Sequence, residues 1–492
     1  MRPDYETSPA DTIDVIIEVE PRRKSQVQLG LGIMSGVLTT GRAAQEQISI
    51  PQWDVHLIGS YEHRNFMGGL RRFKIEDRPR LLFLEPFPDR PDNSPRFGNL
   101  ISAQFTQPGV FEPRTTMFVE ANADYGPDPF QLFFRNDIGM AIGLERGFWK
   151  QRIKLRGAIH QELMFVSTEK RQAILKGQRY PKNTNLVDVR ENSDGESLAG
   201  ERRYPKVTQE DSLPRIDVKD PDGMLLGKGC RDVYLDKTSQ NDDQPVCARS
   251  LDEVLPSSYR LPFLEEKVTI DLRDDSQNPS QGGFFSLSFH QAFNIEGKSW
   301  NYLRVVPDIR GYAPIGLGMV LAARFMVGAI AIFDADDSLD YQARKNGPQA
   351  YRLRGGGAQS NRGFLPGQLG DSRVGGTRQW ESSVELRVPL AESFSIVGFG
   401  DIGDVSGCPV EPKESNGTQN VGCNPHFRWE RLNTTFGGGV RYRTIVGPIR
   451  LDVGYRPKNL QRADGEPGEE DTLNIGKAKF RGAVHLTIGE AF

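Results

Sequence analysis

The residues best placed for a specific polar contact lie in a glycine-rich stretch and in an alternating segment that follows it. The loop tip Asn361-Arg362-Gly363-Phe364 lies among glycines, which let a loop fold back at little steric cost. The segment ending in Phe399-Gly400-Asp401-Ile402-Gly403 alternates as a strand, so Phe399 and Asp401 share one face. A loop arginine and a strand carboxylate predict one buried ion pair, Arg362 with Asp401. The alternative is that Arg362-Gly363-Phe364 is an ordinary turn tripeptide.

Residues for covalent catalysis or phosphate binding do not converge in this stretch. Asp401 and Asp404 are spaced as an acid pair could be, yet no histidine or nucleophile follows at a recognisable spacing. Gly355-Gly356-Gly357 is glycine-rich like a phosphate-binding loop, but no Lys-Ser or Lys-Thr follows it and no helical pattern begins there. We therefore expect neither an enzyme nor a bound cofactor.

The elements that must carry these residues are alternating segments, which recur along most of the chain. From Gly447 to Arg456, one face holds only apolar side chains and the other holds arginine, aspartate and glycine. Charge at every second position of neighbouring strands predicts a face toward water, so the opposite face needs a second sheet or lipid as cover. About sixteen such segments follow Ser25, an even number as in bacterial single-chain barrels.

Composition narrows the protein class further. Of 492 residues, 37% are hydrophobic, and the best helical candidate, Ile315 to Phe333, is split by Arg324. This disfavours a helical membrane bundle, whereas barrel strands hide their lipid face in every second residue. The net charge of −3 gives no reason to expect a nucleic-acid partner. We predict an all-β chain, an antiparallel transmembrane barrel of about sixteen strands with long extracellular loops.

Three further segments bear on this prediction. Residues 169–261 are rich in Asp, Asn, Lys, Pro and Ser, which predicts a long extracellular loop. Residues 335–376 form the loop that holds Arg362. The final segment, from Phe480, alternates to the end of the chain and places four apolar residues at one parity, namely Val484, Leu486, Ile488 and Phe492.

These motifs resemble the BamA/TamA superfamily of outer-membrane assembly proteins. In that family an Arg-Gly-aromatic loop tip folds into a sixteen-stranded barrel and meets the aspartate of an aromatic-x-Asp-x-Gly strand. The resemblance implies that Arg362, Gly363 and Phe364 lie in the lumen, with Phe399, Asp401 and Gly403 on the facing strand. It also implies that the terminal strand is the C-terminal signal by which barrel substrates are recognised.

The resemblance implies a domain organisation as well. Residues 12–20 alternate like the strand that closes the last periplasmic POTRA domain, so residues 1–24 are expected to be a remnant of that domain and a linker. Residues 25–492 are then the barrel. No apolar signal segment follows Met1, and we expect that the chain begins downstream of its natural start.

By resemblance, the expected function is the insertion of barrel proteins into the bacterial cell outer membrane, or the movement of polypeptides across it. A client strand would add at a lateral seam between the first and last strands. The implied partners are the outer-membrane lipid bilayer, unfolded outer-membrane or secreted clients, and a periplasmic or inner-membrane accessory protein that binds the missing POTRA domains. A passive outer-membrane channel and a soluble double-layered β protein are the alternatives.

The four cysteines form two spaced couples in polar segments. We expect Cys230 to pair with Cys247 and Cys408 with Cys423, as loop disulfides in an oxidising compartment. Four cysteines allow three connectivities, so local pairing is one of several. A zinc site is disfavoured because CxxC spacing and nearby histidines are lacking, and no metal is expected.

Overall fold

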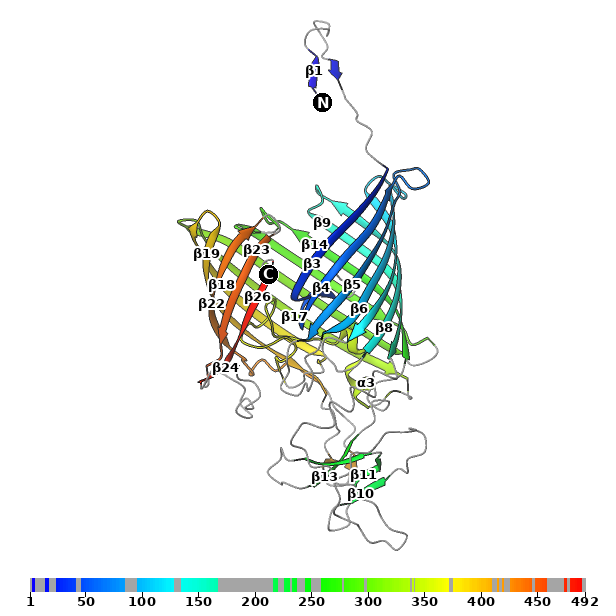
Figure 1. Ribbon diagram of the computed structural model, residues 1–492, viewed down its shortest axis with the longest axis vertical. Coiled ribbons are helices and arrows are strands. Elements are labelled where there is room, and N and C mark those ends of the chain that lie inside the picture. Colours follow the sequence, from blue (N-terminus) through cyan, green and yellow to red (C-terminus); the bar gives the residue numbers. More distant parts are fainter. Residues whose placement is uncertain are drawn as a thin grey trace.

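One antiparallel sheet of sixteen strands makes up most of the computed structural model (Figure 1). Residues described are 2–4, 14–16, 24–40, 46–84, 95–127, 134–166, 216–219, 225–230, 232–236, 244–248, 258–276, 278–295, 299–336, 339, 341–370, 375–408, 414–415, 418–419, 425–444, 447–457, 473–475 and 478–488. In some strands only the backbone is described.

The strands of this sheet follow one another in chain order. In order across the sheet they are Ser25–Thr40 (β3), Glu46–Arg64 (β4), Arg72–Leu84 (β5), Arg96–Pro108 (β6), Thr115–Pro127 (β7), Phe134–Phe148 (β8), Ile153–Val166 (β9), Ser258–Asp271 (β14), Gly282–Ala292 (β15), Trp300–Gly316 (β16), Met319–Ala335 (β17), Arg378–Ala391 (β18), Phe394–Ser406 (β19), Thr435–Thr444 (β22), Gly447–Tyr455 (β23) and Gly482–Ile488 (β26). The prediction of an all-β fold with about sixteen antiparallel strands is confirmed.

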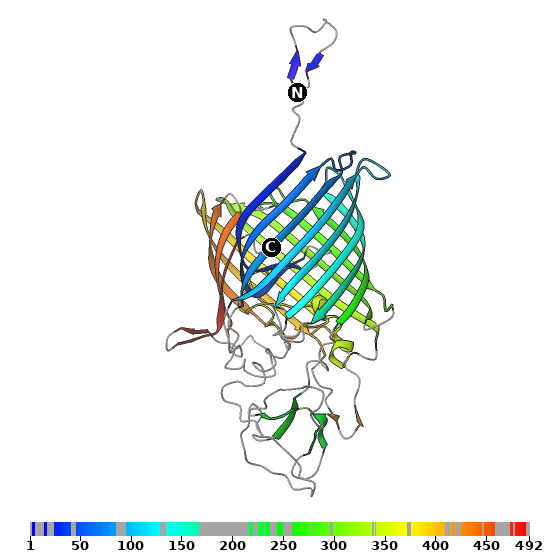
Figure 2. The same ribbon diagram turned by 45° about the vertical axis from the view of Figure 1, so that its right-hand side comes forward.

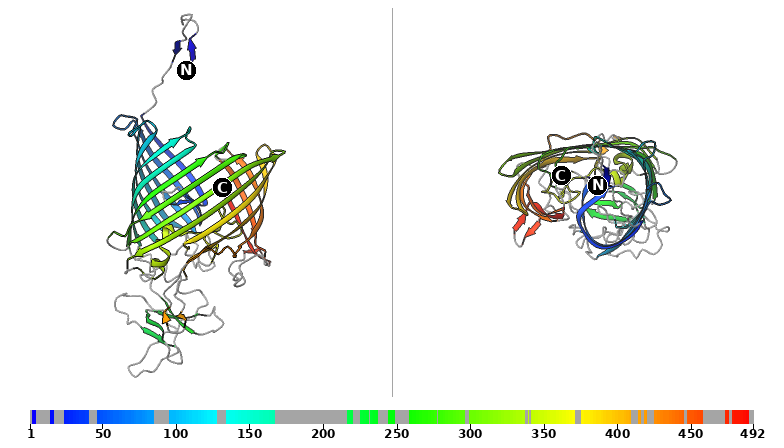
Figure 3. Two further views of the ribbon diagram at one scale, coloured as in Figure 1. Left: turned by 180° about the vertical axis from the view of Figure 1, so that it is seen from behind. Right: turned by 90° about the horizontal axis from the view of Figure 1, so that it is seen from above.

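The sheet curves into an incomplete ring, whose blue and red edge strands lie on the same side when seen from above (Figure 3). Those edges are β3 and β26. Some of their Cα atoms approach within 8 Å, but no hydrogen-bonded ladder joins them in the described residues. The space that the curved sheet encloses is called the lumen below.

The two faces of the sheet differ as the alternation predicts. On β23, Leu451 and Val453 are 42% and 40% exposed on the outer face, whereas Arg450 and Asp452 are fully buried on the lumen side. Exposed apolar side chains also occur on β4, β5, β6 and β8. These strands are tilted in the sheet (Figure 2). The polar face therefore turns inward and the apolar face outward, which is the arrangement of a membrane barrel. Within the described segments, no helix is long and apolar enough to cross a membrane.

Connections at the two ends of the sheet differ in length. At the end where β3 begins, Leu317 and Gly318 alone join β16 to β17, and residues 149–152 join β8 to β9. At the opposite end, the connections span residues 167–257, 336–377 and 407–434. Since outer-membrane barrels have short periplasmic turns and long extracellular loops, β3 begins at the periplasmic end.

Short strands outside the sheet form separate pairs. Arg2–Asp4 (β1) pairs with Asp14–Ile16 (β2), so the strand expected within residues 12–20 has a partner. Four strands lie in the expected long loop: Ile216–Lys219 (β10), Leu225–Cys230 (β11), Asp232–Asp236 (β12) and Gln244–Ala248 (β13). Two further pairs are Glu414–Ser415 (β20) with Thr418–Gln419 (β21), and Leu473–Ile475 (β24) with Ala478–Phe480 (β25). The predicted loop 169–261 ends too late, because β14 begins at Ser258 and pairs with β9.

Candidate functional site: the lumen loop and its docking wall

The connection between β17 and β18, residues 336–377, folds into the lumen and is called the lumen loop. Its first half contains a short helix, Tyr341–Asn346 (α3), and a 3-10 turn, Gln349–Tyr351 (η2). Trp300 Nε1 on β16 donates to the Ala343 carbonyl at 2.8 Å. Tyr351 and Leu353 join an apolar cluster with inward side chains of β9, β14, β15, β16 and β17. Burial of this cluster anchors the base of the loop to one side of the lumen.

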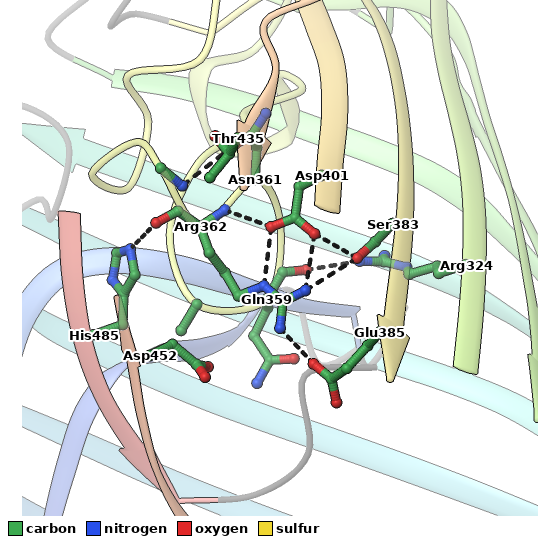
Figure 4. Close-up of polar contacts among 12 residues, drawn as sticks. Arg324, Gln359, Asn361, Arg362, Ser383, Glu385, Asp401, Thr435, Asp452 and His485 are labelled. Atoms are coloured by element: carbon green, nitrogen blue, oxygen red, sulfur yellow. Dashed lines mark hydrogen bonds and ion pairs between the residues drawn. The ribbon is translucent and has the colours of Figure 1, made fainter. Parts of the chain in front are cut away.

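The second half of the loop brings Arg362 to β18 and β19, where it meets Asp401 (Figure 4). Arg362 Nε donates to Asp401 Oδ2 at 2.9 Å and Nη2 donates to Oδ1 at 2.8 Å. The Arg362 backbone N–H donates to the same Oδ2 at 3.0 Å. Each residue is only 1% exposed. This bidentate geometry fixes the orientation of the loop tip as well as its position.

Further groups on β18 and β19 complete the arginine pocket. Arg362 Nη1 donates to Glu385 Oε2 at 2.5 Å, and Nη2 donates to the Ser383 hydroxyl at 3.2 Å. The Phe399 ring lies under the guanidinium, with its centroid 3.5 Å from Cζ. The guanidinium is thus held by two carboxylates, a hydroxyl and an aromatic face, which suits its planar, delocalised charge.

The carboxylate Glu385 also serves two other arginines. Arg441 Nη2 donates to Glu385 Oε2 at 3.1 Å, and Arg387 Nε donates to Oε1 at 2.9 Å. Arg441 Nη1 also donates to Asp452 Oδ1 at 2.5 Å, and Arg450 Nη2 donates to Asp452 Oδ2 at 2.7 Å. The expected single ion pair is therefore part of a buried network that runs from β18 to β23.

Strand register explains why these side chains converge. Ser383, Asp401 and Thr435 lie directly opposite one another on β18, β19 and β22. The neighbouring row runs Glu385, Phe399, Gly437, Gly454 and Ala483, from β18 to β26. The members of both rows lie on the lumen face. The first row supplies polar partners for the loop tip, and the second row ends in three small residues.

The three small residues lie side by side on the lumen face and are called here the shelf: Gly437, Gly454 and Ala483. A Cβ at Gly454 would lie 2.7 Å from the Arg362 carbonyl carbon, closer than real Cβ atoms come. A Cβ at Gly437 would overlap the Phe399 ring. Ala483 is fully buried beside them. Close approach of the loop backbone explains the glycine at position 454, and the Phe399 ring explains the glycine at position 437.

Backbone and amide groups fasten the tip on either side of Arg362. Asn361 Nδ2 donates to the Asn433 carbonyl at 2.6 Å, and the Thr435 hydroxyl donates to Asn361 Oδ1 at 2.5 Å. On β26, His485 Nε2 lies 3.1 Å from the Arg362 carbonyl oxygen. Nearer the start of the tip, Arg324 Nη1 on β17 donates to the Gln359 carbonyl at 2.6 Å. The tip thus contacts β17, β18, β19, β22, β23 and β26.

Other predicted site residues lie close by. Phe364 packs with Leu369 and Val405, and the Arg456 guanidinium lies 4.5 Å from its ring centroid. The Gly403 carbonyl accepts from the Asn433 backbone N–H at 3.2 Å. Asp404 binds Arg428, with Nε to Oδ2 at 2.7 Å. Asp401 and Asp404 therefore each hold a different arginine, and they do not form an acid pair.

The predicted terminal strand and disulfides are only partly described. Val484 and Leu486 are 46% and 47% exposed on the outer face of β26, whereas the Ile488 side chain and all of Phe492 lie outside the described residues. Cys408 is buried and disulfide-bonded. The side chains of the other cysteines, Cys230, Cys247 and Cys423, lie outside the described part of the chain, so both pairings stay predictions.

Several residues of the pocket were absent from the sequence-based prediction. Ser383, Glu385 and Arg387 alternate along one strand, which predicts a polar inner face but names no partner. Asn361 belongs to the predicted loop tip, but the sequence assigns it no partner. Nothing in the pattern links His485 to a loop more than a hundred residues earlier.

Comparisons with known proteins bear on the family and the fold of this chain. The family model described as the Omp85 superfamily domain matches residues 232–492. BamA from Haemophilus ducreyi, in a structure lacking POTRA domains 1–3, superposes with a TM-score of 0.56 at 11% identity, over 99% of this chain and 74% of that one. CdiB from Acinetobacter baumannii gives a TM-score of 0.44 at 9% identity, over 95% and 60%. A sequence comparison with curated proteins gives no match.

Proposed function

Because this chain belongs to the Omp85 superfamily, whose members insert or translocate proteins at the bacterial outer membrane, we propose that it acts at the seam between β3 and β26. In this proposal an unfolded client offers a strand to the open edge and is released into the bilayer as further strands follow. Strand pairing drives the process, so the proposed action needs no enzymatic chemistry.

The observation that carries the proposal is that no hydrogen-bonded ladder joins β3 to β26 in the part of the chain that the structure describes. Every other pair of neighbours in the sheet is hydrogen-bonded. β26 pairs over seven residues and β23 has nine, whereas β16 and β17 have seventeen each. Gly30 and Gly32 lie in β3, where glycine weakens a strand. Unpaired edge groups are costly in a bilayer, so an incoming strand that pairs with them is strongly favoured.

A disulfide tether across the seam tests the proposal. Cysteine pairs are scanned between residues 26–31 of β3 and residues 482–487 of β26, and the pair that oxidises is kept. The tethered protein in vesicles receives a urea-denatured eight-stranded barrel, whose insertion is followed by heat-modifiable gel migration. We expect the tether to block insertion and a reductant to restore it.

The matched control places the tether inside the sheet, at Ala103 on β6 and Ala121 on β7, which already lie opposite each other. This tether should leave insertion unchanged. If the seam tether oxidises fully and the client still inserts at the untethered rate, the proposed route is wrong.

A passive channel is the alternative that the same barrel allows. The lumen loop favours the assembly role, because it is held inside the barrel both at its base, on β9 and β14 to β17, and at its tip, on β18 and β19. Single-channel recording separates the two functions. A large, steady conductance with the loop docked would favour a channel.

A further inference from the structure

We propose that His485 is a positioning residue, which ties the tip of the lumen loop to the last strand and so holds β26 in place at the edge of the sheet. The inference rests on the proposed function, because it concerns the strand at which the client is expected to pair. In this proposal His485 contacts neither β3 nor the client strand. It acts on β26 through the lumen loop.

The contact itself is specific. His485 is 8% exposed, and its Nε2 lies 3.1 Å from the Arg362 carbonyl oxygen (Figure 4). A carbonyl oxygen can only accept, so Nε2 must carry the hydrogen. The shelf allows this approach, because Gly454 brings no Cβ between the loop backbone and the wall. His485 stands opposite Asp452, one row along from the shelf.

The contact with His485 matters because β26 is an edge strand of the sheet. Among the described residues, β23 is the strand with which β26 pairs in the sheet, and β26 is only seven residues long. An edge strand this short, with one neighbour, frays readily. The loop tip supplies a second attachment, since the same residue that donates to Asp401 on β19 accepts from His485 on β26. The tip therefore braces the edge strand from inside the lumen.

Coupling of this kind is reciprocal. If a docked loop steadies β26, then a displaced β26 must loosen the loop by the same free energy. Loop docking can therefore be measured without a client. This separates the role of His485 from the proposed insertion function.

The test uses a reporter cysteine at Leu365, a partly exposed residue next to the docked tip, with the native disulfide left intact. A membrane-impermeant maleimide labels it at a rate that reports undocking. His485→Phe keeps the ring but removes the donor. His485→Gln restores a donor at a similar reach. Thr487→Val is the matched control on the same face of β26, because Thr487 is 2% exposed and its hydroxyl has no partner in the described part of the chain.

We expect His485→Phe to raise the labelling rate roughly 2- to 12-fold, as the loss of one hydrogen bond implies. His485→Gln and Thr487→Val should label at the wild-type rate. Equal rates for His485→Phe and wild type, or equal acceleration in Phe and Gln variants, would overturn the proposal. If His485→Phe does not give a heat-modifiable barrel, the labelling rate of His485→Ala is compared with that of wild type at a lower temperature.

A client assay then distinguishes the two ideas. If labelling responds as expected but insertion through the seam does not occur, His485 still positions the loop and the proposed function fails. If insertion is blocked by the seam tether while labelling ignores the His485 variants, the function stands and the positioning role falls.

Discussion

Removal of either partner of the Arg362–Asp401 pair should undock the lumen loop. Both residues are 1% exposed, so the pair falls among buried ion pairs, for which removal of one partner costs about 3–5 kcal/mol. A water-filled lumen would reduce that figure, but water does not reach these side chains in the docked loop. Arg362→Ala removes the arginine from Asp401 and also its contacts with Glu385 and Phe399, although Glu385 keeps Arg387 and Arg441. In Asp401→Ala the guanidinium keeps its contact with Glu385. The arginine variant should therefore be the more damaged.

A double-mutant cycle gives the decisive measurement. Loop docking is followed by proteinase K cleavage within residues 352–370, since trypsin would lose its own site in Arg362→Ala. The barrel itself is checked by heat-modifiable migration, which should persist in every variant. We expect the double variant to lose much less than the sum of the single losses, because the second change removes a contact that the first has already broken.

Arg362→Lys serves as the control for charge alone. Lysine keeps the positive charge but cannot present two parallel N–H groups to Asp401 or lie flat on Phe399. Its docking should be intermediate. Strictly additive losses in the cycle, or full docking in Arg362→Lys, would refute the argument that bidentate geometry holds the tip.

Three further predictions follow from other parts of the structure. Gly454→Ala should loosen the loop as much as loss of a polar contact does, because the new Cβ collides with the Arg362 backbone; protease sensitivity measures it, and an unchanged loop would contradict the shelf. Ile101→Arg, midway along β6 on the outer face, should lower barrel stability by about 2–4 kcal/mol in chemical unfolding. Gln104→Arg on the lumen face beside Glu120 should cost far less, and equal costs would contradict the assignment of faces. Non-reducing peptide mapping should show a Cys408–Cys423 peptide, and a different partner for Cys408 would exclude that pairing.

The sequence by itself determined the strands, their faces and the loop tip. Alternation is a local property, because successive side chains of a strand point to opposite sides whatever lies around them. Arg450, Asp452 and Gly454 could therefore be assigned to one face from the order of residues alone, and Phe399 with Asp401 likewise. The glycines around Arg362 predicted a loop that folds back, for an equally local reason.

The tertiary structure alone decided which residues meet. Glu385, Thr435 and His485 lie on three strands separated by long connections, and only the register across β18, β19, β22, β23 and β26 places them around one loop tip. Register depends on how all the strands pack, and a pattern with a period of two cannot specify it between distant segments. The open edge between β3 and β26 has the same origin. Two alternating strands are equally able to pair or to stay apart, and the balance is set by strand length, curvature and the loop that holds β26 from within.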